Sequence, residues 1–395
     1  MNAGRSTYAP QSGLAYGHAP HEDPSGGGHS MSRVVIAHDF METYGGAERV
    51  TQEMARAFPD APVYAILGRP SVARRMGIAE RFQSLLPARP RVLRSYRLGA
   101  PILPLVVDRM RLPEADVLLT SSYAFALRFR TANDAPQVCY CHSPLRFAWT
   151  MTDSYRAERA RGKLSAAAFD ALAWAMRRSD GRTSTRVSRF LTQSPFVAEQ
   201  ISRFYGRSST VIGAPVDCDL FRPQNGASAP DDYFLFCGRL VEPYKRAEAA
   251  IEAFRRLPAR LVVAGDGPAL DRLRATAPPN VEFTGHLADA DLVDLMQRCQ
   301  ALVFPSRDDF GLLPLEVMAC GRPVLAFAGG GARHTVVPGL TGELFEAQTP
   351  AAIEEAVAGF DPGAYDSARI RDHALGWDKP AFRERLLAAV EEARR

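Results

Sequence analysis

Short apolar segments alternate with stretches of helical periodicity along this chain of 395 residues, and the alternation occurs twice. The apolar segments of the first series are 34–37, 63–67, 117–120, 137–141, 190–193 and 210–212. Those of the second series are 233–237, 261–264, 281–284, 301–304 and 324–328. The predicted helices are 47–58, 164–178, 247–257, 269–276, 289–300, 314–320 and 379–395. Because strands that alternate with helices form parallel sheets covered on both faces, each series predicts one doubly wound α/β domain.

The length of the chain also favours two domains over one. Residues 1–30 contain much Gly, Ser, His and Pro without a hydrophobic period, and we expect a disordered tail there. We place a first Rossmann-like domain at 31–215 and a second at 216–376, with a hinge at 213–221. The helix at 377–395 has apolar residues at helical spacing, which predicts that it covers an apolar surface. We expect this helix to return to the first domain.

Composition restricts the class of protein. No apolar run reaches the ~18–20 residues of a membrane span, and no secretory signal pattern is evident, so we expect a cytoplasmic protein. The six cysteines are scattered, which favours buried free thiols. Cys139, Cys141 and His142 are too closely spaced for a usual zinc site, where two to four residues separate the cysteines, and we predict no metal site.

Charge is unevenly distributed along the chain. Residues 31–216 contain 27 Arg and Lys against 15 Asp and Glu, whereas residues 217–395 contain 20 against 27. The basic first half is expected to meet something anionic, although a solvated arginine-rich surface would give the same count. Residues 69–97 hold eight arginines among apolar residues, with one acid. This pattern predicts contact with an anionic membrane surface; the alternative is an arginine-rich solvated helix over the sheet.

In doubly wound folds, ligands bind beyond the carboxyl ends of the strands, so the loops that follow strands are informative. Gly45 and Gly46 follow the first strand and come just before a helix. Glycines there permit positive φ and close approach of the backbone, and the helix start offers free N–H groups, although an ordinary turn would look the same. His142 directly follows another strand, where it is either functional or a structural histidine.

Two further loops belong to the second domain. Arg239 and Lys245 lie in the loop after its first strand and before a helix, an arrangement that predicts a diphosphate cradle rather than a solvated charged loop. Asp308 precedes a helix that carries Glu316 eight positions later. Glu316 could accept hydrogen bonds from a ribose and Asp308 could reach a sugar, although an acid near a helix start is also a common partner of the helix dipole.

Together, the order and spacing of these four segments resemble the retaining glycosyltransferases of family four, which have the GT-B fold. The resemblance runs from about Val34 to the C-terminal helix and is strongest at 238–245, 265–268 and 308–323. The opening His-Asp-Phe and Gly-Gly-Ala-Glu-Arg segments, with Tyr-Cys-His-Ser-Pro at 140–144, are similar to the bacterial mannosyltransferase-type branch of O-antigen and exopolysaccharide assembly.

The resemblance implies roles in donor binding for residues of the second domain. Arg239 and Lys245, with Gly238 beside them, would hold the donor diphosphate. Glu316 would hold the ribose, and Leu287 would lie near the base. The resemblance thus implies a nucleotide-sugar-binding second domain and an acceptor-binding first domain.

The resemblance also implies which residues surround the transferred sugar. Asp308 would hold the sugar together with a backbone stretch, namely Phe310, Gly311, Leu312 and Leu313. His142 would sit beside the anomeric carbon, and Gly45 and Gly46 would approach the phosphate or the acceptor. The family usually has Glu where this chain has Asp308, which is shorter by roughly 1.5 Å. Since a shift of ~1 Å can cost ~100-fold in rate, the neighbouring Asp309 is a second candidate for the same role.

The resemblance implies a retaining, metal-independent hexosyltransferase that uses no cofactor. GDP-mannose is the expected donor and a glycan or polyprenyl-diphosphate-linked oligosaccharide the expected acceptor, with no nucleic acid as partner. The enzyme would act at the inner face of the plasma membrane. The alternatives are a UDP-sugar-dependent enzyme of the same fold and a degenerate nucleotide-binding scaffold. A phosphorylase would need a pyridoxal lysine, and none of the three lysines, Lys163, Lys245 and Lys379, suits that role.

Overall fold

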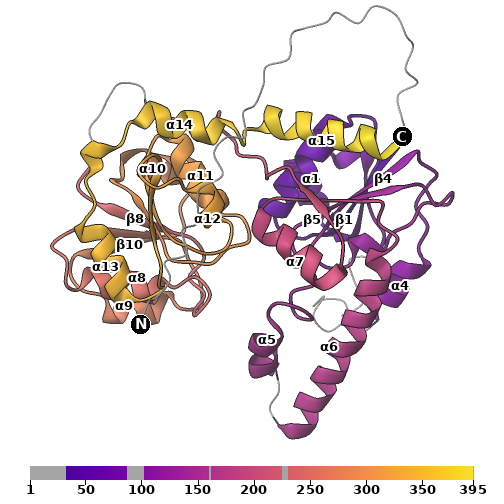
Figure 1. The fold of residues 1–395 in the computed structure, drawn as a ribbon, viewed down its shortest axis with the longest axis horizontal. Coiled ribbons are helices and arrows are strands. Elements are labelled where there is room, and N and C mark those ends of the chain that lie inside the picture. Colours follow the sequence, from indigo (N-terminus) through magenta and orange to yellow (C-terminus); the bar gives the residue numbers. More distant parts are fainter. Residues whose placement is uncertain (1–32, 87–101, 160–161, 225–229, 395) are drawn as a thin grey trace, which may run out of the picture. The chain divides into compact units, whose positions relative to one another are not determined.

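The computed structural model describes residues 33–86, 102–159, 162–224 and 230–394, so the predicted tail at 1–30 lies outside the described residues. Two parallel sheets form the frame (Figure 1). The first has the strand order β3-β2-β1-β4-β5-β6-β7 and the second has the order β10-β9-β8-β11-β12-β13. The prediction of two doubly wound α/β domains is confirmed.

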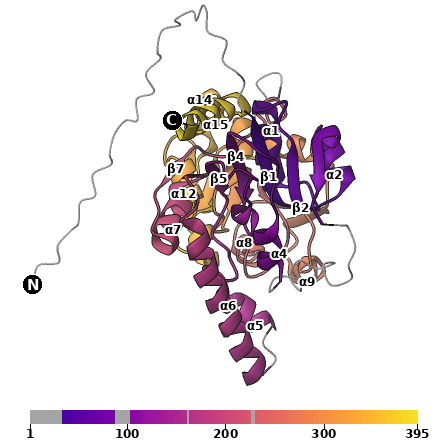
Figure 2. The same cartoon turned by 90° about the vertical axis from the view of Figure 1, so that its right-hand side faces the viewer.

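The elements of the first domain largely follow the predicted segments. They are β1 (Val34–Met41), α1 (Gly46–Ala57), β2 (Val63–Gly68), α2 (Pro70–Arg75), η1 (Ala79–Arg81), β3 (Phe82–Ser84), α4 (Leu103–Arg109), β4 (Val117–Ser122), η3 (Ala126–Arg128), β5 (Gln137–Cys141), α5 (Thr152–Arg159), α6 (Lys163–Ser184), β6 (Arg189–Thr192), α7 (Pro195–Tyr205) and β7 (Ser209–Val211). The helix predicted at 164–178 extends to Ser184 as α6, which runs beside α5 beyond the sheet of this domain (Figure 2).

The second domain also follows its predicted alternation. Its elements are β8 (Phe234–Cys237), α8 (Ala247–Phe254), β9 (Leu261–Ala264), α9 (Leu270–Thr276), β10 (Val281–Gly285), α10 (Asp289–Arg298), β11 (Leu302–Phe304), α11 (Leu312–Ala319), β12 (Val324–Phe327), α12 (Ala332–Thr335), β13 (Gly342–Phe345), α13 (Pro350–Ala358), η4 (Pro362–Ala364) and α14 (Ser367–Leu375). The last helix, α15 (Lys379–Arg394), follows this domain in the chain. The strand β13 and the helices α13 and α14 were not predicted.

Helix α7 was not predicted either, although local signals mark both of its ends. The Ser194 side chain accepts a hydrogen bond from the Val197 N–H, and Pro195 occupies the first turn. Gly206 ends the helix with φ of 65°, a left-handed conformation that glycine adopts without strain. A capping serine, a proline and a terminal glycine together are a typical helix signature.

The central strands of both sheets are almost entirely buried, as expected for parallel sheets with helices on both faces. Strand β1 is buried over its full length, and near its carboxyl end it carries two buried polar residues, His38 and Asp39. Five of the six cysteines are buried and all six are free. Buried polar groups require partners, so His38 and Asp39 direct attention to this end of the sheet.

Residues 69–86 are the described part of the segment at 69–97, whose predicted contact with an anionic membrane surface stays a prediction. These described residues form α2, η1 and β3 rather than one helix. Met76 and Ile78 are each 3% exposed and belong to the hydrophobic core. The Arg81 guanidinium donates to backbone carbonyl oxygens of the protein at 2.6–3.0 Å. Residues 87–97 lie outside the described residues. Within the described ranges, no helix combines the length and apolarity needed to span a bilayer.

The C-terminal helix α15 contacts the first domain, as the sequence indicated. It lies beside α1 (Figure 1), where Arg383 forms an ion pair with Glu53. Phe382 is fully buried, and its ring lies 6.0 Å from that of Tyr140 on β5. The last helix of the chain therefore packs on α1 and on strands β4 and β5 of the first domain.

We expect Phe382→Ala to lower the free energy of unfolding by about 3–5 kcal/mol, because the change leaves a cavity under α15. Leu387 lies on the same helix and is 44% exposed, so Leu387→Ala should change stability by less than about 1 kcal/mol. Urea unfolding of both variants and the parent chain measures the difference. Equal losses in the two variants would contradict the packing of Phe382 against the sheet.

Candidate functional site

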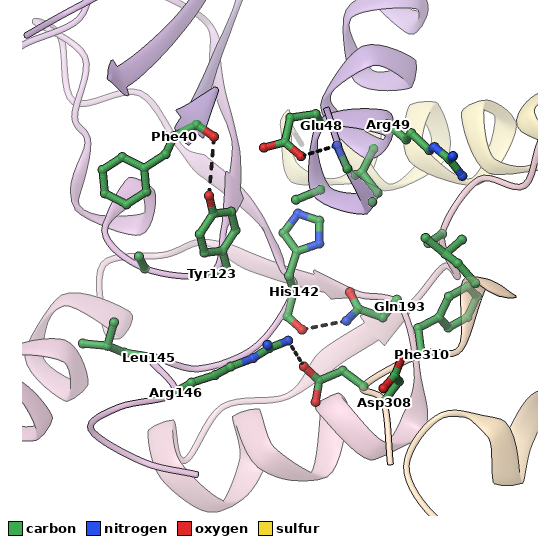
Figure 3. Close-up of a pocket in the computed structure, with 18 of the residues that line it drawn as sticks. Phe40, Glu48, Arg49, Tyr123, His142, Leu145, Arg146, Gln193, Asp308 and Phe310 are labelled. Atoms are coloured by element: carbon green, nitrogen blue, oxygen red, sulfur yellow. Dashed lines mark hydrogen bonds and ion pairs between the residues drawn. The ribbon is translucent and has the colours of Figure 1, made fainter. Parts of the chain in front are cut away.

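A cavity of about 740 Å³ lies between loops of the two domains (Figure 3). Nine of the predicted site residues line it, namely Gly45, Gly46, His142, Asp308, Phe310, Gly311, Leu312, Leu313 and Glu316. The second candidate for the role of Asp308, Asp309, lines it as well. Figure 3 shows His142, Arg146 and Asp308 pointing toward this space. The predicted convergence of loops that are far apart in the sequence is therefore observed for these nine positions.

Four other predicted residues do not line the cavity, namely Gly238, Arg239, Lys245 and Leu287. Lys245 reaches it indirectly, since its Nζ lies 2.6 and 2.9 Å from the two carboxylate oxygens of Asp308. Arg239 is exposed, and within the described ranges its side chain makes no hydrogen bond or ion pair. Leu287 packs against the hydrophobic core. Its place near the nucleotide base stays a prediction.

Gly46 allows a close approach between the two domains. A Cβ atom at this position would lie 3.0 Å from Leu312 Cδ1 of α11. Gly45 precedes α1 with φ of −137°, and its N–H donates to Glu48 Oε2 at 2.9 Å. The positive φ that these glycines were predicted to permit is therefore not used, because the N-cap of α1 is extended. The close backbone approach at Gly46 is observed.

Glycines that the sequence analysis passed over shape the loop of Asp308. The Gly331 N–H donates to the carbonyl oxygen of Asp308 at 2.8 Å. A Cβ on Gly330 would lie 2.2 Å from that same oxygen, and a Cβ on Gly331 would lie 2.1 Å from the carbonyl oxygen of Phe310. Gly311 then starts α11 with φ of 88°. The triplet at 329–331 was the signal in the sequence for this close packing.

Three of the four carboxylates that line the cavity, those of Asp308, Asp309 and Glu316, are each paired with a cation. Glu316 is 8% exposed and forms an ion pair with Arg49 of α1. Burial raises the pKa of Glu316, and the charge of Arg49 opposes the rise. Arg49 is the last residue of the quoted Gly-Gly-Ala-Glu-Arg segment, but it was not among the predicted site residues. The pairing of a residue with another 267 positions away has no local signal.

A second unpredicted arginine holds Asp309. Arg146, four residues after His142, lies 2.5 Å from Asp309 Oδ2. Burial raises the pKa of Asp309, and Arg146 opposes the rise. The backbone carbonyl of Asp309 accepts from the Ser194 hydroxyl at 2.6 Å. Asp309 is thus bound to the first domain, whereas Asp308 is bound to Lys245 of its own domain.

The loop after β4 is fixed by one buried carboxylate. Asp39 of β1 accepts four backbone N–H groups at 2.5–2.8 Å, from Tyr123, Ala124, Phe125 and Ala126. Burial raises the pKa of Asp39, and His38 and the backbone donors oppose the rise. Because three of the four donor residues line the cavity, Asp39 sets one wall of the site without reaching it.

His142 enters the cavity from the end of β5. Its Nε2 lies 2.8 Å from Ser121 Oγ, and its backbone carbonyl accepts from Gln193 at 2.6 Å. Burial lowers the pKa of His142 well below its ordinary value, and the nearby His38 and Arg146 lower it further. The imidazole is therefore neutral at physiological pH, and it can offer one N–H donor and one acceptor.

We expect the ring nitrogen signals of His142 to stay constant in NMR spectra recorded between about pH 8 and about pH 6, where an ordinary histidine titrates. The sign for stability follows from the lowered pKa. The contribution of the neutral ring is complete above the unfolded pKa of about 6.5 and is lost as the pH falls toward the folded value. A midpoint for His142 near pH 6.5 would contradict the desolvation of this ring.

Two protein-family models match the chain, one in each domain. The model described as Glycosyltransferase Family 4 matches residues 44–220, and the model described as Glycosyl transferases group 1 matches residues 231–360. Each of the two α/β domains is therefore similar to a glycosyltransferase domain. The family 4 match covers the Gly45–Gly46 loop and His142. The group 1 match covers the loops of Lys245 and Asp308 together with Glu316.

Two relatives of these glycosyltransferase domains are named by their activities. A D-inositol 3-phosphate glycosyltransferase of Catenulispora acidiphila is 30% identical over 239 residues, which are 52% of this chain and 57% of that protein. A GDP-mannose-dependent alpha-(1-6)-phosphatidylinositol dimannoside mannosyltransferase of Mycobacterium tuberculosis is 31% identical over 165 residues, which are 37% of this chain and 42% of that protein. The chain spans about half the length of these curated relatives.

Solved structures resemble nearly the whole chain. Anabaena HepE in complex with UDP-glucose has a TM-score of 0.65 at 18% identity, covering 91% of this chain and 100% of that one. The lipopolysaccharide outer core galactosyltransferase WaaB in its apo form has a TM-score of 0.61 at 17% identity, covering 90% and 99%. These likenesses confirm the predicted GT-B fold.

Proposed function

We propose that this protein transfers a hexose, with retention of the anomeric configuration, from a nucleotide diphosphate sugar to a glycan or lipid-linked oligosaccharide. The observation that carries the proposal is the cavity between the two domains. The loop that begins at Asp308, the buried Glu316 and the ring of His142 line one space, and all three were expected to contact a nucleotide sugar.

We propose that positively charged side chains bind the diphosphate of the donor. Lys245 and the exposed Arg239 supply positive charge for the diphosphate, since guanidinium and ammonium groups are strong phosphate partners. Glu316 accepts the ribose hydroxyls, and the backbone at 310–313 surrounds the sugar beside Asp308. Lys245 Nζ contacts the Asp308 carboxylate, and we propose that donor binding exchanges this contact for one with phosphate.

GDP-mannose is the donor that we propose. The relative from Mycobacterium tuberculosis, which matches 37% of this chain, is named as GDP-mannose-dependent. A UDP-sugar is the second candidate, because HepE of Anabaena, which matches over nearly its whole length, was solved with UDP-glucose. In either case the diphosphate is the leaving group, and the two basic residues stabilise the charge that it develops.

The reaction that we propose takes place on one face of the sugar. The bond from the anomeric carbon to the donor phosphate oxygen breaks, the acceptor hydroxyl forms the new bond, and the departing oxygen takes the acceptor proton. The protein then positions the reactants and stabilises the leaving diphosphate without a protein nucleophile. Arg239 and Lys245 provide the positive charge that a divalent metal provides in other transferases, so no metal or cofactor is required.

We propose that the first domain binds the acceptor. Three side chains of α5 and α6 bring apolar surface to the cavity, namely Tyr155, Phe169 and Leu172. Such surface suits the lipid-proximal part of a polyprenyl-diphosphate-linked glycan, as used in cell-surface polysaccharide assembly. The basic first domain would then face the anionic inner leaflet of the plasma membrane from the cytoplasm.

The test is a donor panel with the full chain. GDP-mannose, UDP-glucose and UDP-N-acetylglucosamine are supplied with an extract of lipid-linked glycans, and nucleoside diphosphate release and product stereochemistry are measured. We expect release from GDP-mannose and an α-linked product from its α-linked sugar. Turnover of a UDP-sugar alone would overturn the donor. An inverted product would overturn the mechanism, and binding without turnover of any donor would indicate a non-catalytic scaffold.

A further inference from the structure

A series of hydrogen-bonded, buried polar side chains connects His142 to His38. Donor binding does not account for His38 or Ser121, because neither residue lines the cavity. Strand register creates it, because β1 pairs with β4 such that His38 lies beside Ser121. His142 follows β5, whose last residue pairs with the position after Ser121. Ser121 Oγ lies 3.0 Å from His38 Nδ1 on one side and 2.8 Å from His142 Nε2 on the other. One hydroxyl thus connects two imidazole rings.

The direction of these hydrogen bonds follows from the groups around His38. Its Nδ1 lies 3.2 Å from the backbone carbonyl oxygen of Ser121, which can only accept. Its Nδ1 also lies 3.0 Å from Thr51 Oγ1, whose own hydrogen is donated to the Ala47 carbonyl oxygen at 3.0 Å. Both neighbours therefore require a proton on His38 Nδ1. That N–H also faces Ser121 Oγ, which leaves the serine hydrogen free to be donated onward.

We infer that His38 and Ser121 hold His142 in the neutral tautomer that carries its proton on Nδ1. The serine hydroxyl donates to Nε2 of His142, so Nε2 acts as an acceptor and the ring proton occupies the other nitrogen. Among the residues that the structure describes, His142 Nδ1 makes no hydrogen bond, and the residue lines the cavity. The ring therefore offers one N–H donor to a ligand.

This assignment determines the chemistry that His142 can recognise. An N–H donor suits a ligand oxygen with lone pairs, such as a sugar hydroxyl or a phosphate oxygen, whereas the other tautomer would present a lone pair to it. The inference rests on the proposed function for the identity of that ligand, but not for the tautomer itself. His38 and Ser121 are positioning residues, since neither lines the cavity.

The same series of side chains also reaches the glycine loop, which lines the cavity too. His38 Nε2 lies 3.6 Å from Glu48 Oε1, and the second oxygen of Glu48 accepts the Gly45 N–H at 2.9 Å. His38 therefore contacts groups that hold both Gly45 and His142, and it is completely buried. A change at His38 should alter the two walls together, whereas a change at Ser121 should alter His142 alone.

The tautomer is read directly from long-range ¹H–¹⁵N spectra of the full chain with labelled histidine, in which protonated and unprotonated ring nitrogens have separate shifts. His142→Gln identifies the signal. We expect the parent protein to show a protonated Nδ1 and an unprotonated Nε2 at His142. Ser121→Ala removes the donor to Nε2 and should shift the population toward the Nε2–H tautomer. His38→Phe should shift it as well.

Matched variants separate this role from mere packing. Ser121→Thr keeps the hydroxyl, and His38→Asn places an amide N–H where Nδ1 was, so both should retain the parent tautomer. Thr51→Val removes a neighbour of His38 without touching the serine and should also retain it. In the transfer assay, Ser121→Ala should lower kcat by about 10- to 100-fold and change the donor KM by less than about threefold, since a lost hydrogen bond to a reacting group acts on the rate.

Two results would overturn the inference. The first is a parent protein with the proton of His142 on Nε2. The second is a Ser121→Ala variant, folded by circular dichroism, whose His142 tautomer is unchanged. A parent tautomer as expected in a protein that turns over no donor would refute the proposed function and support the inference, so the two failures are distinguishable.

Discussion

Replacing Lys245 with alanine should lower sugar transfer by about 10- to 150-fold while the fold is retained, because a charge-assisted hydrogen bond contributes about 1.5–3 kcal/mol. Lys245 lies on the loop between β8 and α8 and contacts the carboxylate of Asp308 at the edge of the cavity. Its loss removes a cation from the proposed diphosphate site. The measurement is kcat/KM for the donor, with nucleotide affinity determined in parallel by calorimetry.

Two control variants make this result specific. Lys245→Arg keeps the positive charge and should retain more activity than Lys245→Ala. Arg239→Ala removes the exposed neighbouring cation and should weaken donor binding by a similar amount, with no effect on the apo fold, because that side chain has no partner among the described residues. Unchanged nucleotide affinity in both alanine variants would remove Arg239 and Lys245 from the donor site.

The sequence predicted the frame of this protein well because that frame depends on local periodicity. Parallel strands are buried on both faces and appear as short apolar runs, so the central strands of both sheets were found. The edge strand β3 (Phe82–Ser84) is only three residues long and partly exposed, and it lay within an arginine-rich segment that was assigned to a membrane surface. Met76 and Ile78 of that segment are buried in the core, and the composition gave no sign of their direction.

The loops that line the cavity were singled out by the order and spacing of their motifs, which resemble those of the family four glycosyltransferases. The partners of these residues were not predicted, because pairing across domains is a property of the folded chain. Arg49 and Arg146 bind carboxylates 267 and 163 positions away. His38 and Ser121 meet only because β1 and β4 pair in one register, and a shift by one residue would point both side chains elsewhere. The sequence therefore identified the motif residues that line the cavity, but not the residues that hold them in place.

Replacing Glu316 with glutamine should reduce transfer by about 100-fold and also lower stability, because two effects coincide at this residue. Glu316 is proposed to hold the donor ribose, and it is the partner of Arg49 in an ion pair that joins α11 to α1. Glutamine keeps the shape but loses the charge, leaving Arg49 without compensation. Because the Arg49 side chain is 35% exposed, we expect a loss of stability of only about 1–3 kcal/mol.

A double-mutant cycle separates the two effects of Glu316. Arg49→Met and Glu316→Gln are made singly and together, and unfolding and transfer are measured for all four proteins. The stability losses should be less than additive, by about 1 kcal/mol or more, because the double variant leaves no unpaired charge. Transfer should stay low in the double variant, since the carboxylate that binds the ribose is still missing. Recovery of transfer together with stability would mean that Glu316 serves only to hold Arg49 and does not touch the donor.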